Sequence, residues 1–417
     1  MKLPPSLRAL HYRNFQLYMS GQSISLVGTW MQRIAISWLV YEMTHSAFML
    51  GLVAFASRIP MMFLSPYAGA YVDRHSRYQT LLVTQFASML QAGLLALVVL
   101  TNHYNIVIII ALSIMLGIIN AFDAPSRQSL MIVLVQNNDD LPNAIALNST
   151  MVTLARLVGP AMAGILLSTV GEGICFLINF LSFIAVITTL LMMKIKVPAK
   201  IKHTEKIWQN LRQGFTYLKR NPGLKHAIML MATMSLVIMP YTTLLPIYAK
   251  SVFNGDVTTF SWLNIISGLG ALMGAIYVAR LHTEKNLLKV IIGAGLLIST
   301  SLVLFSYITY LPLSLFLIMI GEAGLLTFIA ATNTYLQTHV EENMRGRVIS
   351  YYVMAFGGML PIGSLAVGLL AHLTSAPFTI LIEGLIGMIA IFSFIPAFKK
   401  TTKRSEEKAK KLKSGLR

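Results

Sequence analysis

Long apolar runs alternate with short polar segments along almost the whole chain. A helix needs about 20 predominantly apolar residues to cross the hydrocarbon core of a bilayer. We place twelve such runs, with approximate limits at residues 15–41, 47–71, 79–100, 105–122, 143–170, 173–193, 224–249, 258–279, 287–310, 311–334, 347–373 and 377–398. The pattern predicts an all-α membrane protein with twelve transmembrane helices.

The longest polar interruption divides these runs six and six. We therefore expect an N-terminal six-helix bundle at 1–193, a linker at 194–223, a C-terminal six-helix bundle at 224–398 and a basic tail at 399–417. The tail is low in apolar residues, so it is expected to be disordered.

Within the linker, four apolar residues recur at helical spacing among basic ones: Trp208, Leu211, Phe215 and Leu218. This spacing predicts a short amphipathic helix on the membrane surface. A solvated linker helix is favoured over a regulatory one.

The two halves look duplicated. Tyr71-Val72-Asp73-Arg74 after the second run is echoed by Tyr277-Val278-Ala279-Arg280 after the eighth. Val135-Gln136-Asn137-Asn138 is echoed by Val340-Glu341-Glu342-Asn343, at an offset that agrees with the first within one residue. Repeated halves are the ground plan of many secondary transporters, so two pseudo-symmetric bundles are predicted.

Composition and charge support this architecture and give it an orientation. The chain is 56% hydrophobic and 12% charged, with a formal net charge of +18. Of the 33 Lys and Arg residues, all but four lie in segments that share one side of the membrane. The exceptions are Lys250 in an outer loop, and Arg33, Arg58 and Arg156 inside spans. By the positive-inside rule both termini are cytoplasmic, and the basic charge indicates a lipid bilayer as partner, not nucleic acid.

Sequence signals of catalysis or of a bound cofactor are lacking. No Gly-Lys dipeptide exists for a nucleotide-binding loop, no His-Glu-x-x-His pattern for a metal, and Cys175 is the only cysteine. We therefore expect no cofactor, no metal and no enzymatic activity. Without a nucleotide-binding loop, an ion gradient is the default energy source, and a monomer is the expected form.

A charged motif, Gly69-x-x-x-Asp73-Arg74-x-x-Arg77, follows the second run. The rigid guanidinium forks of Arg74 and Arg77 suit them to hold a carboxylate or a helix end in one state and release it in another. The segment resembles the loop between helices two and three of the major facilitator superfamily. Gly159-Pro160-x-x-Ala163-Gly164 resembles that superfamily's antiporter motif, whose small residues allow close helix packing.

A narrower resemblance is to the enterobactin-exporter and third drug:proton antiporter group. It rests on Arg13-Asn14-Phe15-x-Leu17, Gly21-Gln22-x-Ile24-Ser25, Gly28-Thr29-Trp30-Met31-Gln32, Ala121-Phe122-Asp123-x-Pro125-x-Arg127-Gln128 and Leu141-Pro142-Asn143-Ala144-x-Ala146-Leu147-Asn148-Ser149. The resemblance implies a proton-coupled exporter of a siderophore or amphiphilic drug, working by alternating access in the bacterial inner membrane.

Other functions stay open at this point. A lysophospholipid flippase or a small-molecule importer would share the fold. A membrane enzyme or receptor would more often add a soluble domain, and no loop here is large enough to be one.

The resemblance also implies gating residues. Asp73 is expected to attract the start of the eleventh helix, near Arg345 and Arg347, in the outward-facing state, since a carboxylate is favoured at a helix N-terminus. Asp123 and Arg127 lie four residues apart. If the fourth helix continues through this segment, they pair with each other or with the Asp73 loop, as a static ion pair or as a moving relay.

Ionisable residues inside spans mark the candidate cavity: Arg33, Arg58, Arg156 and Glu322. On the superfamily architecture their helices border a central cavity. Three cations and one acid favour an anionic or catechol-like group, with Trp30 and Tyr241 available for stacking. A fixed salt bridge from Glu322 to one arginine is the competing interpretation. For proton coupling, Glu322 is the best-placed acid.

Overall fold

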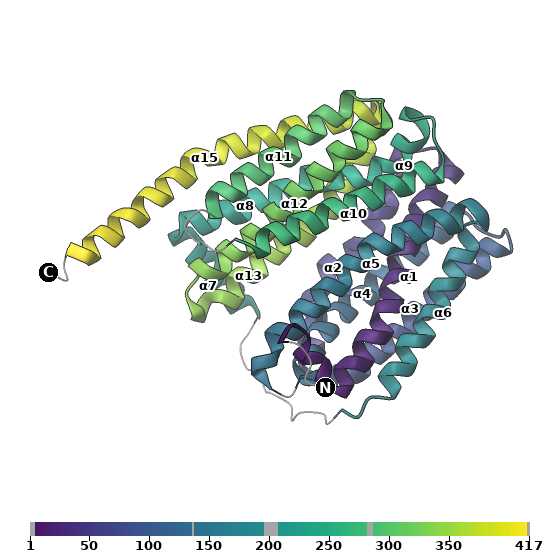
Figure 1. Cartoon of the computed structure of the whole chain (residues 1–417), viewed down its shortest axis with the longest axis horizontal. Coiled ribbons are helices and arrows are strands. Elements are labelled where there is room, and N and C mark those ends of the chain that lie inside the picture. The colour runs from purple at the N-terminus through teal and green to yellow at the C-terminus, as the bar shows by residue number, and fades with distance from the viewer. Residues whose placement is uncertain (1–4, 136, 196–206, 282–286, 415–417) are drawn as a thin grey trace. The chain divides into compact units, whose positions relative to one another are not determined.

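The computed structural model describes residues 5–135, 137–195, 207–281 and 287–414, and every regular element in them is helical (Figure 1). The longer helices are α1 (Arg13–Thr44), α2 (Ala47–Arg74), α3 (Arg77–Leu100), α4 (Ile106–Leu134), α5 (Leu141–Thr169), α6 (Glu172–Leu191), α7 (Ile207–Arg220), α8 (Pro222–Val237), α10 (Val257–Ala279), α11 (Leu287–Tyr307), α12 (Leu311–His339), α13 (Arg345–Val353), α14 (Met359–Leu373) and α15 (Ala376–Ser414).

Side-chain caps fix where several helices begin. Ser46, Ser76, Asn105 and Asp256 precede α2, α3, α4 and α10, and each accepts a hydrogen bond from a backbone N–H two or three residues further on. Such caps satisfy donors that have no partner inside the helix. Residues with short polar side chains thus define where these four helices begin.

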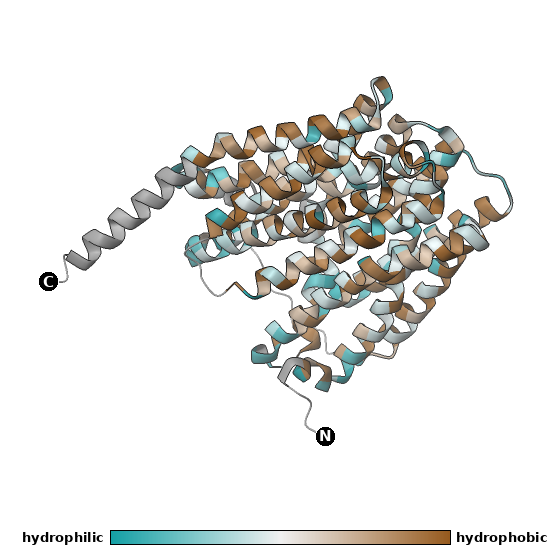
Figure 2. Ribbon diagram, turned by 45° about the horizontal axis from the view of Figure 1, so that its top comes forward, coloured by the Kyte–Doolittle hydropathy of each residue, from teal (hydrophilic) through white to brown (hydrophobic). Residues whose placement is uncertain are grey.

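Eleven helical segments in the described part of the chain are long and apolar enough to cross a membrane. Figure 2 shows hydrophobic residues along the helices. Helix α1 has 32 residues, or about 48 Å at 1.5 Å per residue, but it is too polar to be among the eleven. Its Gln22, Ser25 and Gln32 are at most 2% exposed because they face neighbouring helices. With α1, the membrane-length helical segments number twelve.

The helix bounds repeat along the chain. Helices α4 and α12 both have 29 residues and are displaced by 205 positions, and α2 and α10 end with the same displacement. The sequence echoes therefore coincide with repeated structural elements. The repeat does not extend to charge, because Phe328 and Thr332 of α12 stand where α4 has Asp123 and Arg127.

Two compact units can be distinguished. Unit 1 comprises Met1–His203 with Thr243–Gly268, and unit 2 comprises Thr204–Thr242 with Leu269–Arg417. In unit 1, α1 packs against α5 and α6, α2 against α4, and α3 against α4 and α6. In unit 2, α11 packs against α12 and α15, and α8 against α14 and α15.

Two spans that the sequence treats as continuous contain irregular turns. After α8 the chain forms a 3-10 turn at Met239–Leu244, the single turn α9 (Leu245–Ile247) and a π-turn at Tyr248–Val252. Pro240 and Pro246 lie in this segment and lack the N–H that a regular helix needs. A second π-turn, Met354–Gly358, separates α13 from α14.

The expected disorder of the tail is wrong, because α15 continues as one helix to Ser414 (Figure 1). In the linker, α7 covers Ile207–Arg220, where the sequence predicted a helix.

Contacts of Asn143, which lies in a segment that carries the narrower resemblance, and of the neighbouring Asp140 hold the start of the chain to α5. The Asn143 side chain accepts a hydrogen bond from the Ala9 backbone (2.9 Å), and the Tyr12 hydroxyl donates to Asp140 (2.9 Å). The carboxylate of Asp140 also raises the pKa of the Tyr12 phenol. The first 3-10 turn, Pro5–His11, is thereby held to the start of α5.

A buried polar network links four helices of unit 1. Asn179 donates to Gln32 Oε1 (2.7 Å), Gln32 donates to Gln91 Oε1 (3.0 Å), and Gln91 donates to the Leu112 carbonyl (3.3 Å). The three polar side chains are at most 2% exposed. Polar groups that find partners across helices hold spanning helices together in lipid.

We expect Asn179→Leu to lower stability by about 1–2 kcal/mol, since it leaves Gln32 Oε1 buried without its donor. The measurement is the midpoint of thermal unfolding in detergent. Asn264→Leu is the matched control, because Asn264 bonds only within its own helix, to the Phe260 carbonyl. An equal loss in both variants would contradict a role for the inter-helix network.

Candidate functional site

The charged motif after the second span straddles the turn between α2 and α3. Gly69 and Arg74 lie in the last turns of α2, and Arg77 is the first residue of α3. The Asp73 side chain lies outside what the structure describes. A Cβ added to Gly69 would meet nothing within 4 Å, so this conformation does not require glycine there. The Arg77 guanidinium donates to the Ser129 carbonyl of α4 (3.3 Å).

Helix α4 continues through Pro125, and this places Asp123 and Arg127 one above the other. Arg127 donates to Asp123 Oδ2 through both Nε (3.1 Å) and Nη2 (2.5 Å). The Asp123 side chain is 8% exposed and the Arg127 side chain is 22% exposed, so the pair is largely withdrawn from solvent. Removing either partner of such a pair leaves the other charge unpaired and destabilises the protein.

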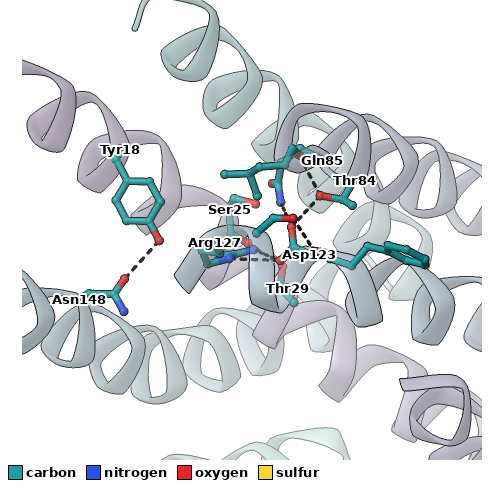
Figure 3. A network of polar contacts seen from close by, with 11 residues as sticks. Tyr18, Ser25, Thr29, Thr84, Gln85, Asp123, Arg127 and Asn148 are labelled. Carbon is teal, nitrogen blue, oxygen red and sulfur yellow. Dashed lines mark hydrogen bonds and ion pairs between the residues drawn. The ribbon is translucent and has the colours of Figure 1, made fainter. Parts of the chain in front are cut away.

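The second oxygen of Asp123 faces α3 (Figure 3). Gln85 Nε2 donates to Asp123 Oδ1 at 2.6 Å, and the Thr84 hydroxyl lies 3.0 Å from the same atom. The carboxylate is therefore surrounded by hydrogen-bond donors from two helices, α3 and α4. Sequence reasoning missed Thr84 and Gln85. The signal for them was a polar stripe in an apolar span, which runs on through Ser88 and Gln91.

Aromatic contacts connect this pair to the end of α2. Tyr71 stacks on His75 with ring centroids 3.9 Å apart, and it meets Phe122 edge-on at 5.8 Å. Phe122 directly precedes Asp123. Aromatic contacts thus run from the α2–α3 turn to the residue beside the ion pair.

On the other side of the pair, Tyr18 joins α1 to α5. Its hydroxyl donates to Asn148 Oδ1 (3.3 Å), and its side chain is fully buried. Ser25 and Thr29 of α1 also line this region in Figure 3. Four helices of unit 1 thus meet around Asp123 and Arg127.

The predicted counterpart arginines begin a helix of unit 2. Arg345 is the first residue of α13 and is exposed, and Arg347 is half-buried. An added Cβ on Gly214 of α7 would lie 3.3 Å from Arg347 Cβ, so α7 packs on the start of α13.

The Gly-Pro-x-x-Ala-Gly motif lies in the middle of α5, which stays one continuous helix. Gly159, Pro160, Ala163 and Gly164 are all buried. A Cβ on Gly159 would lie 2.5 Å from Trp30 Cβ, and one on Gly164 would lie 2.6 Å from Ser261. The two glycines therefore permit close approach to α1 and to α10.

Trp30 gathers two of the intramembrane arginines. The Arg33 guanidinium lies over its ring, with Cζ 4.7 Å from the centroid, and Arg156 Cζ lies 5.9 Å from the same centroid. Arg58 of α2 is close enough for its charge to act on Arg33. The ring expected to stack on a ligand is thus engaged by Arg33 in this conformation.

Glu322 of α12 is 1% exposed and accepts a hydrogen bond from the Tyr241 hydroxyl (2.7 Å). Tyr241 lies in the 3-10 turn after α8 and is also 1% exposed, so it is not presented to a ligand in this conformation. The acid is held beside an irregular segment of a spanning helix, which is where transporters often place their sites. Among the described residues, no group of three His, Cys, Asp or Glu side chains is placed to hold a metal ion.

Comparison with known proteins assigns the family. Residues 6–414 match the family described as transmembrane secretion effectors, MFS_3. The chain belongs to this family of major facilitator transporters.

Relatives in this family span nearly the same length. The chain is 26% identical over 385 residues to the staphyloferrin A transporter of Staphylococcus aureus strain NCTC 8325 / PS 47, covering 91% of this chain and 95% of the relative. It is 23% identical over 392 residues to macrolide efflux protein A of Streptococcus pyogenes, covering 91% and 96%.

A solved nucleoside transporter, NupG, superposes with a TM-score of 0.70 at 15% identity, over 93% of this chain and 99% of that one. At this identity the likeness concerns the fold alone.

The membership confirms the predicted twelve-helix major facilitator fold. It makes the chain a multi-pass membrane transporter of bacterial type with efflux-type relatives, and not an enzyme. A small-molecule substrate is consistent with this family.

Proposed function

We propose that this major facilitator protein is a proton-coupled exporter of a siderophore or amphiphilic drug-like molecule. It works as a monomer by alternating access in the bacterial inner membrane, with both termini in the cytoplasm. The observation that carries the proposal is the buried Asp123–Arg127 pair. Placing two charges in a membrane span costs free energy, and such residues usually serve a function, here the movement of helices during transport.

Export as the direction of transport is supported by the relatives. The family is described by secretion, and one relative is named for macrolide efflux. A second is named for a siderophore, staphyloferrin A. The orientation of the termini rests on the distribution of Lys and Arg along the chain.

The gate is proposed to work through the ion pair. Gly69, Asp73, Arg74 and Arg77 flank the α2–α3 turn. In the outward-facing state, Asp73 engages the start of α13 near Arg345 and Arg347. The Asp123–Arg127 pair fixes the neighbouring helices when this latch is closed. Its release lets unit 1 rearrange, which alternating access requires.

Substrate and proton handling are assigned to the intramembrane residues Trp30, Arg33, Arg58, Arg156, Tyr241 and Glu322. The antiporter motif at Gly159, Pro160, Ala163 and Gly164 provides the close packing of α5 against α1 at Trp30.

The test uses inside-out membrane vesicles from cells that express the chain. An imposed pH gradient, acid inside, is expected to drive uptake of a macrolide or a siderophore into these vesicles. Uptake into right-side-out vesicles instead would indicate an importer, and lipid translocation without either cargo would indicate a flippase.

We expect Glu322→Gln to uncouple transport from the proton gradient. Glutamine keeps an oxygen that accepts from Tyr241, but it cannot take up or release a proton at this site. Proteoliposomes containing the variant should still exchange substrate, while an imposed pH step should no longer accelerate transport. Glu341→Gln, the same substitution at an exposed glutamate outside the candidate cavity, is the control and should respond to the pH step as the unmodified chain does. A full response of Glu322→Gln to the pH step removes Glu322 from the coupling role.

A further inference from the structure

Three arginines of unit 1 lie inside membrane-spanning helices and converge from three of them. Arg33 comes from α1, Arg58 from α2 and Arg156 from α5. Arg33 and Arg58 are exposed, and Arg156 is half-buried. A guanidinium in a spanning segment does not face hydrocarbon, so its exposure indicates a water-accessible surface inside the protein.

The cluster has a net positive charge that the protein leaves uncompensated at two of its members. Arg58 and Arg156 both lie close enough to repel Arg33. In the part of the chain that the structure describes, neither Arg33 nor Arg58 forms an ion pair with a carboxylate. Arginine cannot relieve this repulsion by losing its proton. An arriving anion relieves it.

Trp30 positions the arginines. Its ring lies below Arg33 and near Arg156, at 4.7 and 5.9 Å from the guanidinium carbons. Behind it, Gly159 allows α5 to approach to contact distance, so the ring is held by the α1–α5 packing. A guanidinium that rests on a fixed aromatic face loses less freedom when it binds a ligand.

We propose that Arg33, Arg58 and Arg156 around Trp30 form the recognition site for an organic anion with two or more carboxylate groups. This rests on the proposed export function and names its substrate class. Each guanidinium fork matches one carboxylate in a bidentate fashion. Three guanidinium groups on three helices exceed what one carboxylate can bind. A ligand with several carboxylates can contact more than one of them at once.

The test measures binding without transport. Citrate serves as the probe, and isothermal titration calorimetry is performed on the purified full chain in lipid nanodiscs at low ionic strength. Citrate is expected to bind, and triethyl citrate, its uncharged ester, is not. Arg33→Gln and Arg58→Gln should each weaken citrate binding about tenfold or more. Arg33→Lys, which keeps the charge and loses the fork, should give an intermediate loss.

Lys250→Gln is the matched control, because it removes one positive charge from an exposed position outside the cluster. It should bind citrate as the unmodified chain does. The proposal is overturned if citrate fails to bind, if the arginine variants bind it unchanged, or if inorganic phosphate binds as tightly with the same arginine dependence.

The outcome separates this inference from the proposed export function. A chain that exports a macrolide but does not bind citrate loses the polycarboxylate site and keeps its function as an exporter. A chain that binds citrate through these arginines but drives no efflux keeps the site and loses the export assignment.

Discussion

Asp123→Asn should reduce efflux to below about a tenth of the unmodified rate while leaving the amount of protein in the membrane unchanged. The substitution puts an amide N–H₂ among Arg127, Thr84 and Gln85, each of which donates to the native carboxylate. Losing the partner of a buried charge costs about 3–5 kcal/mol, and partial exposure of Arg127 reduces this to about 2 kcal/mol. That shifts a conformational equilibrium about 30-fold.

The measurement is drug or siderophore efflux normalised to the protein detected in the membrane. Asp139→Asn is the control, because Asp139 is an exposed carboxylate outside the ion pair, and it should transport normally. Normal efflux by Asp123→Asn would remove the pair from the gate.

A double variant separates a static ion pair from a moving relay, the two alternatives that the sequence leaves open. Asp123→Asn combined with Arg127→Gln leaves no unpaired charge, so thermal stability should return close to that of the unmodified chain. If the charges act during the transport cycle, efflux stays low in this variant. Recovery of efflux together with stability indicates a purely structural pair.

Gly159→Ala is expected to have the second-largest effect. The added methyl group would lie 2.5 Å from Trp30 Cβ and 3.1 Å from the Val27 carbonyl, so α5 must move away from α1. Overpacking of this kind costs about 1–3 kcal/mol. It also displaces Trp30, on whose ring Arg33 rests. Both thermal stability and substrate affinity should therefore fall, and efflux should drop about tenfold or more at low substrate concentration.

Gly293→Ala in α11 is the matched control. It makes the same substitution at an exposed glycine with nothing within 4 Å of the new methyl group. Alanine there should be neutral or stabilise by about 0.5–1 kcal/mol, because it favours the helix. If Gly159→Ala unfolds and transports as this control does, the α1–α5 contact at Trp30 has no role.

Much of the architecture could be read from the chain alone. The apolar runs gave the spans, and the echoes around Tyr71 and Tyr277 gave the repeat that the helix bounds reproduce. The limits of the spans were predicted less accurately. The fourth run was placed at 105–122 because hydrophobicity falls beyond it, but α4 continues through Pro125 to Leu134. A proline inside a membrane helix is tolerated when neighbouring groups satisfy the freed backbone.

The candidate site was predicted only in part. Asp123 and Arg127 were recognised by their spacing on one helix, which local geometry fixes. Thr84 and Gln85 were not recognised, since they come from another helix and no linear spacing connects them to Asp123. The contact of Arg33 with the Trp30 ring was likewise not predicted, because the sequence does not fix the direction in which either side chain points.

The sequence by itself determined the number of membrane spans, the repeat of the two halves and the uneven distribution of Lys and Arg between the two sides. It also determined which residues make up the charged motifs. These depend on length, apolar content and local spacing, to which a bilayer responds directly. Only the tertiary structure decided that Asp123 is held from α3, that Gly159 packs against Trp30, and that Tyr241 sits in an irregular turn against Glu322. A helix that is apolar on all sides does not reveal which face it turns to its neighbours, so contacts across helices emerge only once the helices are packed.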